Sequence, residues 1–264
     1  MPRPSGSNAV EKTLAVLDAL GEHERIADIS DATGIHKSTV HRILQDFTRL
    51  GFARVTDQGT YQGGSRILGL AGRVLARSDA AERARPELVA LQRETGATVH
   101  LALLDGHEAV YVAKVEGAKP YRMASRVGMA MPLHCTAIGK VLLAWESADR
   151  QTRALAGCDF KRFREKTITD RTAFAAELER TREQGFGQDR EEFDEHIRCV
   201  GVPIFDRHNQ AVAGLSVSFP TFRFDVAREP AVVGMLQQAS RVVSKQLGCT
   251  NYPLPPAAGK ATTR

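Results

Sequence analysis

IADISDATGIHKSTVHRILQDFTRLGFARV, residues 26–55, is the stretch that decides the fold of the N-terminal part of the chain. Its first segment is short and amphipathic and ends at Gly34, a residue suited to the tight turn between two helices. The second segment ends at Gly51 and carries apolar residues at helical spacing, namely Val40, Ile43, Leu44, Phe47 and Leu50. The stretch therefore predicts two helices joined by a turn, with one face of the second helix buried.

The other face of the second predicted helix is polar and mostly basic. Asp46 is the only acid between Lys37 and Arg49. The remaining groups are cations, hydroxyls and amides, which bond phosphates and base edges in the major groove of DNA: Lys37, Ser38, Thr39, His41, Arg42, Gln45 and Arg49. The alternative is a solvated surface, because most charged helix faces have no other role.

A short hairpin is predicted directly after this helix. Residues 52–55 (FARV) have the pattern of a strand, residues 56–59 (TDQG) that of a turn, and residues 60–62 (TYQ) that of the returning strand. A hairpin in this position makes a winged helix-turn-helix, which favours DNA binding over a merely solvated face. Arg54 lies on the predicted wing, where a cation would contact phosphate.

The chain has 264 residues, enough for two domains with separate cores. Its formal charge of +5 allows nucleic-acid binding without requiring it. Up to Arg77 there are 10 basic and 8 acidic residues, a net of +2, so the surface of the second helix is better evidence than total charge. We expect a cytoplasmic protein with free thiols, because it has four isolated cysteines and neither a signal peptide nor a long apolar run.

The chain is predicted to have two domains and short ends. We expect a flexible arm over residues 1–8, a winged helix-turn-helix domain over 9–64 and a linker helix over 65–77 that buries one face against that domain or another subunit. The second domain is expected over 78–250, with a disordered tail over 251–264. The first helix has a capping box at Asn8 and apolar residues Val10, Leu14, Leu17 and Leu20.

The second domain alternates strand-like and helix-like segments. Strands are predicted at 98–104, 109–115, 121–127, 199–205 and 212–219, with helices around 85–95 and 139–145. Asp170 caps a further helix that Gly185 ends, and a last helix reaches about Leu247. Strands joined by hairpins and interrupted by helices predict an α+β fold with an antiparallel sheet.

From Val10 to Leu247 the chain resembles the IclR-type family of bacterial transcription regulators. Four segments carry the resemblance: GIHKSTVHRIL at 34–44, PLHCTAIGKVLLA at 132–144, DREEFDEHIRCV at 189–200 and VAGLSVSFP at 212–220. The resemblance implies a winged helix that binds operator DNA and a GAF-like domain that binds a small effector. It also implies a homodimer or tetramer that reads a roughly palindromic site.

Two positions depart from the pattern of the family. His36 stands where the family often has Pro, and Ala27 stands where it often has a hydroxyl cap. Proline there only presets φ, so the helix should still form, while the missing cap weakens the first turn of the preceding helix. His36 is a candidate contact to phosphate or base, with a solvated turn histidine as the alternative.

Small residues at 132–136 precede a predicted helix whose first N–H groups can bind an anion, so a carboxylate fits there. The resemblance implies that the backbone of Ala137 and Ile138 holds such a group. It further implies that polar residues and an apolar wall complete the pocket: Asp189, Cys199, Ser216, Ser218, Met123 and Met131. Ser216 and Ser218 lie two apart on a strand and so share a face. The alternatives are core methionines, a buried cysteine and a surface aspartate.

The sequence leaves three alternatives: an enzyme, a metal-binding protein and an architectural DNA-binding protein. His134 beside Cys135, or His196 near Cys199, could form a thiol nucleophile with a base, but no acid or oxyanion group completes a mechanism. The same four residues match no closed zinc motif. A non-specific architectural DNA-binding protein would not need a second domain. The sequence favours a ligand-responsive, sequence-specific regulator, more often a repressor, of a metabolic or developmental operon. We expect a small organic acid as effector and no enzyme activity, cofactor or metal.

Overall fold

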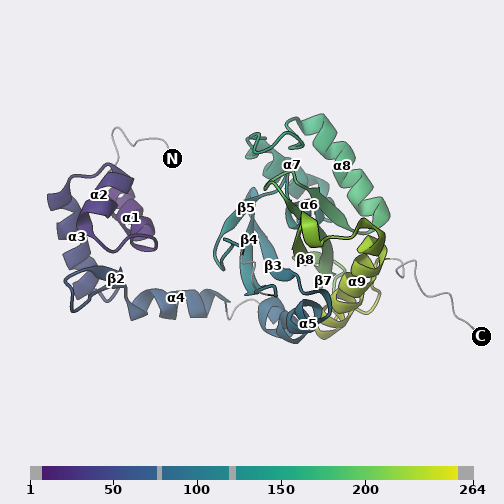
Figure 1. Ribbon diagram of the computed structural model, residues 1–264, viewed down its shortest axis with the longest axis horizontal. Helices are drawn as coiled ribbons and strands as arrows, with labels where there is room; N and C mark the ends of the chain where they lie inside the picture. Colours follow the sequence, from purple (N-terminus) through teal and green to yellow (C-terminus); the bar gives the residue numbers. More distant parts are fainter. Residues whose placement is uncertain (1–7, 76–78, 119–122, 255–264) are drawn as a thin grey trace, which may run out of the picture. The chain divides into compact units, whose positions relative to one another are not determined.

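The computed structural model describes residues 8–75, 79–118 and 123–254. The chain divides into two compact units between Arg77 and Ser78 (Figure 1). Most of the expected N-terminal arm lies outside the described residues, so the prediction for that arm stays a prediction.

The first unit is a winged helix-turn-helix, as predicted. Its elements are α1 (Ala9–Leu20), α2 (Ile26–Thr33), α3 (Lys37–Arg49), the hairpin strands β1 (Ala53–Val55) and β2 (Tyr61–Gly63), and α4 (Ser65–Leu75). The capping box opens α1: the Glu11 amide donates to Asn8 Oδ1 at 2.9 Å, and the Asn8 amide donates to Glu11 Oε2 at 3.1 Å. Gly34 ends α2 at φ 69°, and no side chain caps the start of α2.

The core of this unit differs from the prediction at three places. The side chains of α1 that are buried in the core are Val16 and Leu20, whereas Val10 and Leu14 are 65% and 53% exposed. A helix with apolar residues on several faces does not reveal from sequence which face the neighbouring helices cover. Leu50, expected in the stripe of α3, is 43% exposed, because α3 ends at Arg49 and Leu50 caps it.

The linker helix α4 carries apolar side chains that stay exposed in the single chain. Leu68 is 75% exposed and Leu70 is 40% exposed. The expected burial of one face against the DNA-binding domain is therefore not seen for these leucines. At the start of α4, the Arg66 guanidinium donates to the Leu50 carbonyl and lies over the Phe52 ring.

The second unit is built on a six-stranded antiparallel sheet of order β5-β4-β3-β8-β7-β6. The strands are β3 (Thr98–Asp105), β4 (Glu108–Val115), β5 (Ala130–Pro132), β6 (Gly187–Arg190), β7 (Ile197–Phe205) and β8 (Ala211–Pro220). The helices are α5 (Asp79–Thr95), α6 (Ala137–Ala144), α7 (Ala148–Ala156), α8 (Arg171–Gln184) and α9 (Glu229–Gln246), with short 3-10 turns η1 (Thr221–Arg223) and η2 (Val226–Arg228). The predicted α+β class is confirmed.

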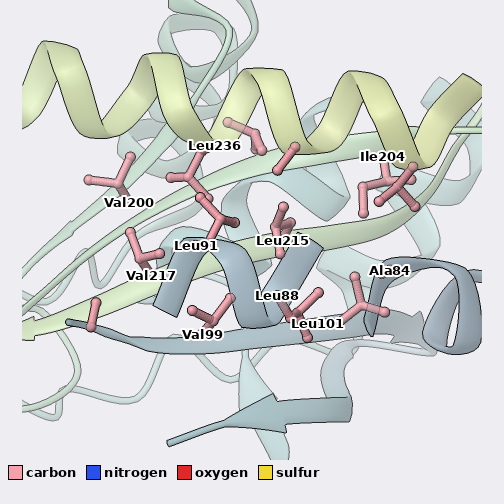
Figure 2. Packing of buried hydrophobic residues seen from close by; sticks show 14 of the residues in the cluster. Ala84, Leu88, Leu91, Val99, Leu101, Val200, Ile204, Leu215, Val217 and Leu236 are labelled. Atoms are coloured by element: carbon pink, nitrogen blue, oxygen red, sulfur yellow. The ribbon is translucent and has the colours of Figure 1, made fainter. Parts of the chain in front are cut away.

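Helices cover both faces of this sheet. Figure 2 shows the side chains of α5 and α9, among them Leu88, Leu91 and Leu236, packed with Val99 and Leu101 of the sheet. On the opposite face α6 packs on the sheet and against α8, and a second apolar cluster forms around Ile138, Leu142 and Phe174. Alternate residues of β3 therefore point to different layers, which places His100 on the α6 face.

Several elements of the second unit differ from the prediction. The described residues 123–127 form no strand, and the strand of this region is β5 instead. Helix α7 and strand β6 were not predicted. Residues 251–254 were expected in a disordered tail, but Leu254 is buried and the Tyr252 hydroxyl bonds Ser240 Oγ at 2.8 Å. Among the described residues no helix is long and apolar enough to cross a membrane.

Candidate functional site

The predicted DNA-contacting side chains share the outer face of α3. Lys37, Ser38, His41 and Arg42 are exposed and Thr39 is half-buried. The opposite face is buried in the core of the unit through Val40, Ile43, Leu44 and Phe47. The structure thus brings together donors of the kinds that contact phosphates and base edges, on a helix of 13 residues.

His36 is the N-cap of α3. Its Nδ1 lies 2.8 Å from Ser38 Oγ and accepts the Ser38 amide at 3.4 Å. A histidine here takes over part of the role that an Asx or hydroxyl cap usually has. The ring remains exposed at the start of the predicted DNA-binding helix.

The wing arginine is positioned by a chain of side-chain hydrogen bonds. Arg54 Nη2 donates to Gln62 Oε1 at 2.6 Å, and Gln62 Nε2 donates to Glu24 Oε1 at 2.6 Å. The Glu24 carbonyl accepts the Tyr61 amide of β2. Both strands of the wing and the residues before α2 therefore hold Arg54, which restricts the conformations of an exposed cation.

The register of the sheet aligns the predicted effector residues in two rows on the α6 face. Asp189, Cys199 and Ser218 pair across β6, β7 and β8 and form the first row, which ends at Thr98 of β3. The second row is Gly187, Gly201, Ser216, His100 and Lys114. Residues far apart in the sequence are therefore neighbours in each row, because adjacent strands of a sheet lie about 5 Å apart.

Helix α6 begins directly over the two glycines of the second row. A methyl group at Gly187 would lie 2.7 Å from the Ala137 carbonyl oxygen, and one at Gly201 would lie 3.4 Å from the Ile138 nitrogen. Thr136 caps the helix: its Oγ1 accepts the Gly139 amide and donates to the Pro132 carbonyl. The amides of Ala137 and Ile138 are the first of α6 and have no carbonyl within the helix to bond.

Asp189 is a buried carboxyl group beside this helix start. It is 3% exposed, and its Oδ1 accepts the Glu192 amide at 2.8 Å. Burial, together with the Glu192 carboxylate, raises the pKa of Asp189 to about 7. The neighbouring Cys199 thiol donates to Ser218 Oγ at 3.1 Å, and burial raises the pKa of Cys199 well above its usual value. These groups are neutral or readily protonated, so the row offers hydrogen bonds more than fixed charge.

The two predicted wall methionines lie in different surroundings. Met131 is buried in the apolar cluster that also contains Tyr111 and Ile138. Met123 is half-buried in the segment 123–129, and its carbonyl accepts a hydrogen bond from Lys114 Nζ at 3.0 Å. Next to Ser218, a cavity of about 240 Å³ opens at the ends of β3 and β8 and is lined further by Thr98 and Arg223.

Two residues of this region were missed in the sequence. Lys140 of α6 is fully buried, and its Nζ contacts the carboxylates of Glu192 at 2.6 Å and Glu177 at 3.0 Å. His100 is 1% exposed, lies beside Ser216 and stacks on Tyr111. A lysine inside the apolar run AIGKVLLA and a histidine inside VHLALL were the available signals, because a polar residue at a buried position needs a partner.

The alternative chemistries find no support among the described residues. His134 is buried with Nε2 bonded to the Lys161 carbonyl, and burial raises the pKa of the Cys135 thiol, which opposes thiolate formation. His196 is 73% exposed on its side chain and lies near Glu195. In the described ranges no three His, Cys, Asp or Glu side chains lie close enough together to hold a metal ion.

Comparison with known proteins covers both units. The model of the IclR helix-turn-helix domain matches residues 9–57, and that of the bacterial transcriptional regulator IclR C-terminal region matches residues 72–245. The HTH-type transcriptional regulator KdgR of Escherichia coli (strain K12) is 40% identical over 254 residues, 95% of this chain and 97% of that protein.

Solved structures agree with this match. The crystal structure of Thermotoga maritima IclR has a TM-score of 0.77 at 31% identity, covering 91% of this chain and 99% of that one. An IclR homolog from Microbacterium hydrocarbonoxydans, crystallised with 4-hydroxybenzoate, shares the fold at 21% identity, with a TM-score of 0.77 and coverage of 91% and 99%. The chain belongs to the IclR family of bacterial helix-turn-helix transcriptional regulators.

Proposed function

We propose that this regulator is a repressor whose α3 reads operator DNA and whose α6 face binds a small organic acid as effector. The observation that carries the proposal is the paired register of Asp189, Cys199 and Ser218 beside the start of α6. Hydrogen-bonding groups converge there with two helix amides, an arrangement suited to a carboxylate. The related protein crystallised with 4-hydroxybenzoate supports an acid as the ligand class.

The proposed DNA contacts are residues on the outer face of α3, its N-cap and the wing cation: Lys37, Ser38, Thr39, His41, Arg42, His36 and Arg54. Helix residues would enter the major groove, and Arg54 would contact phosphate. A purely architectural protein would bind all sequences alike, and it would not need a separate unit with a row of buried polar groups.

Arg42→Ala should weaken binding to the operator by about 1–3 kcal/mol per half-site, because the side chain would bond a base edge or phosphate. Binding is measured at about 0.15 M salt, since the affinity depends steeply on salt. Arg49→Ala is the matched control: Arg49 lies on the same helix but its guanidinium already bonds Asp46 at 2.9 Å. Equal reductions in affinity for the two variants would contradict the role proposed for Arg42.

Asp189→Asn should change how stability depends on pH. The folded carboxyl has a raised pKa of about 7, so between pH 4 and 7 the folded chain binds more protons than the unfolded chain. The free energy of unfolding should therefore fall as pH rises, by about 2 kcal/mol between pH 5.5 and 8. The groups around this carboxyl are Glu192, Lys140, Cys199 and Tyr111.

Urea unfolding of the full chain and of Asp189→Asn at pH 5.5, 7 and 8 measures this dependence. The variant should show a smaller fall than the parent chain. A fall of the same size in both would mean that Asp189 is not the titrating group.

We infer that the regulator acts as a homodimer or a tetramer. Leu68 and Leu70 of α4 and Val10 and Leu14 of α1 are exposed in the single chain, and a second copy would bury them. A two-fold dimer would present two copies of α3 to the two half-sites of a palindromic operator. Sedimentation equilibrium measures the mass, and a monomer at micromolar concentration would refute the assembly.

A further inference from the structure

One edge of the His100 ring is fixed by its surroundings. Nε2 shares a hydrogen bond of 2.8 Å with Ser125 Oγ, and the ring stacks on Tyr111 with 4.4 Å between the centroids. Lys114 Nζ donates to the carbonyls of Met123 and Ser125, which holds the segment that carries Ser125. The imidazole therefore cannot turn to satisfy its second nitrogen without giving up these interactions.

The second nitrogen of His100 is buried and lacks a partner among the described residues. Nδ1 has no hydrogen bond, although the residue is only 1% exposed. A buried polar atom left without a partner costs about 1–3 kcal/mol, so nearly all such atoms in proteins are bonded. Because Val99 and Leu101 face the α5 and α9 core, His100 extends from the α6 face, where Ser216 is its direct neighbour.

The charge of this ring is also settled by its environment. Burial and the nearby Lys114 charge lower the pKa of His100 to about 3, so the ring is neutral at physiological pH. A neutral imidazole presents either an N–H or a lone pair at Nδ1, according to which of its two tautomers is present. A hydroxyl group can complement either tautomer, since it both donates and accepts.

Two lysines near this face are already paired. Lys114 is paired with Glu116 at 2.8 Å and bonded to two carbonyls, and Lys140 is paired with Glu192 and Glu177. The start of α6 lies over Gly201, and one strand, β8, separates Gly201 from His100. The Cα atoms of Gly201 and His100 are thus about 10 Å apart. A short molecule bound at the start of α6 can span this distance, because the side chain of His100 covers part of it.

We propose that His100 is a specificity-determining residue of the effector site, and that its Nδ1 bonds a hydroxyl of a short hydroxylated carboxylic acid whose carboxylate lies at the α6 amides. This inference rests on the effector site proposed above. It adds the residue that distinguishes a hydroxylated acid from its deoxy counterpart. A site that leaves a buried polar atom unpaired rejects the ligand that lacks the matching group.

Two substitutions separate recognition from a structural role. The amide of His100→Asn can occupy the place of Nδ1 but cannot reach Ser125, whereas His100→Gln can replace Nε2 at Ser125 but leaves the Nδ1 position empty. Recognition through Nδ1 predicts that Asn keeps the preference for hydroxylated acids and Gln loses it. A purely structural bond to Ser125 predicts the reverse order. Ser125→Ala is the control, because it removes the bond at Nε2 and leaves Nδ1 in place.

The probes are glycerate against propionate and gluconate against hexanoate, titrated calorimetrically into the full chain. The parent chain should bind at least one hydroxylated acid roughly tenfold tighter than its deoxy partner. This ratio should fall towards one in His100→Gln and persist in His100→Asn and Ser125→Ala. Equal binding within both pairs, or no binding of any probe, would overturn the proposal.

Measuring operator binding with the same protein preparations distinguishes the failure of the proposed repressor function from the failure of the role proposed for His100. A chain that discriminates between the acids through His100 but shows no selective DNA binding would refute the proposed repressor and leave the role of His100 intact. A chain that binds its operator but ignores the hydroxyl groups would refute only the role of His100.

Discussion

Lys140→Met should lower the free energy of unfolding of the second unit by about 3–5 kcal/mol, because breaking a buried ion pair leaves its partners charged and uncompensated. Lys140 Nζ bonds both oxygens of Glu192, at 2.6 and 2.8 Å, as well as Glu177 and the Gln188 carbonyl. Methionine fills a similar volume, so the decrease reports the charge. Urea unfolding of the full chain measures the effect.

The cluster of Lys140, Glu177 and Glu192 also links the start of α6 to Asp189, the two parts of the proposed effector site. Lys140 belongs to the helix whose first amides would hold the carboxylate, and Glu192 donates its amide to Asp189. Removing the lysine should therefore also weaken effector binding. Lys166→Met is the matched control, since its pair with Glu191 lies at the surface and should contribute less than about 1 kcal/mol. Similar decreases in stability for the two variants would contradict a structural role for the buried cluster.

Gly64→Ala should destabilise the first unit by about 3 kcal/mol, because the added methyl group meets backbone that has no room to move. The new carbon would lie 2.2 Å from the Gly51 carbonyl oxygen and 2.9 Å from the Phe52 carbonyl carbon. The Gly64 amide donates to the Phe52 carbonyl at 2.8 Å, so the backbone at Gly64 cannot shift without breaking that bond. Thermal unfolding monitored by circular dichroism measures the effect.

The same substitution should reduce DNA binding, because the clash lies where α3, the wing and α4 meet. Gly72→Ala in α4 is the control: no atom lies within 4 Å of its added methyl group, and alanine favours a helix over glycine by up to about 1 kcal/mol. A Gly64→Ala chain as stable as the control would show that the junction tolerates the methyl group.

Much of the first unit could be predicted because its signals are local. The capping box at Asn8, the turn at Gly34 and the apolar stripe of α3 each depend on residues close in sequence. The face of α1 could be predicted only in part. Leu20 of the predicted stripe is buried, but Val16, outside that stripe, is buried while Val10 and Leu14 are exposed, because packing against the other helices decides the face.

In the second unit the unpredicted parts depend on distant residues. Residues 123–127 have strand-like composition, yet their carbonyls at Met123 and Ser125 bond the Lys114 side chain and form no ladder. The role proposed for Asp189 could be predicted only from the family resemblance, because its burial depends on the pairing of β6 with β7. His100 gave only a weak local signal, and its unpartnered nitrogen is visible only in three dimensions.

The measurement that tests the central claim most directly is binding of the full chain to DNA upstream of its own and neighbouring genes. It is made at about 0.15 M salt with excess non-specific competitor, because affinity depends on salt and non-specific binding is largely electrostatic. The proposed function predicts a discrete complex that survives the competitor with at least one of these fragments. Complexes that the competitor removes from every fragment would contradict a sequence-specific repressor.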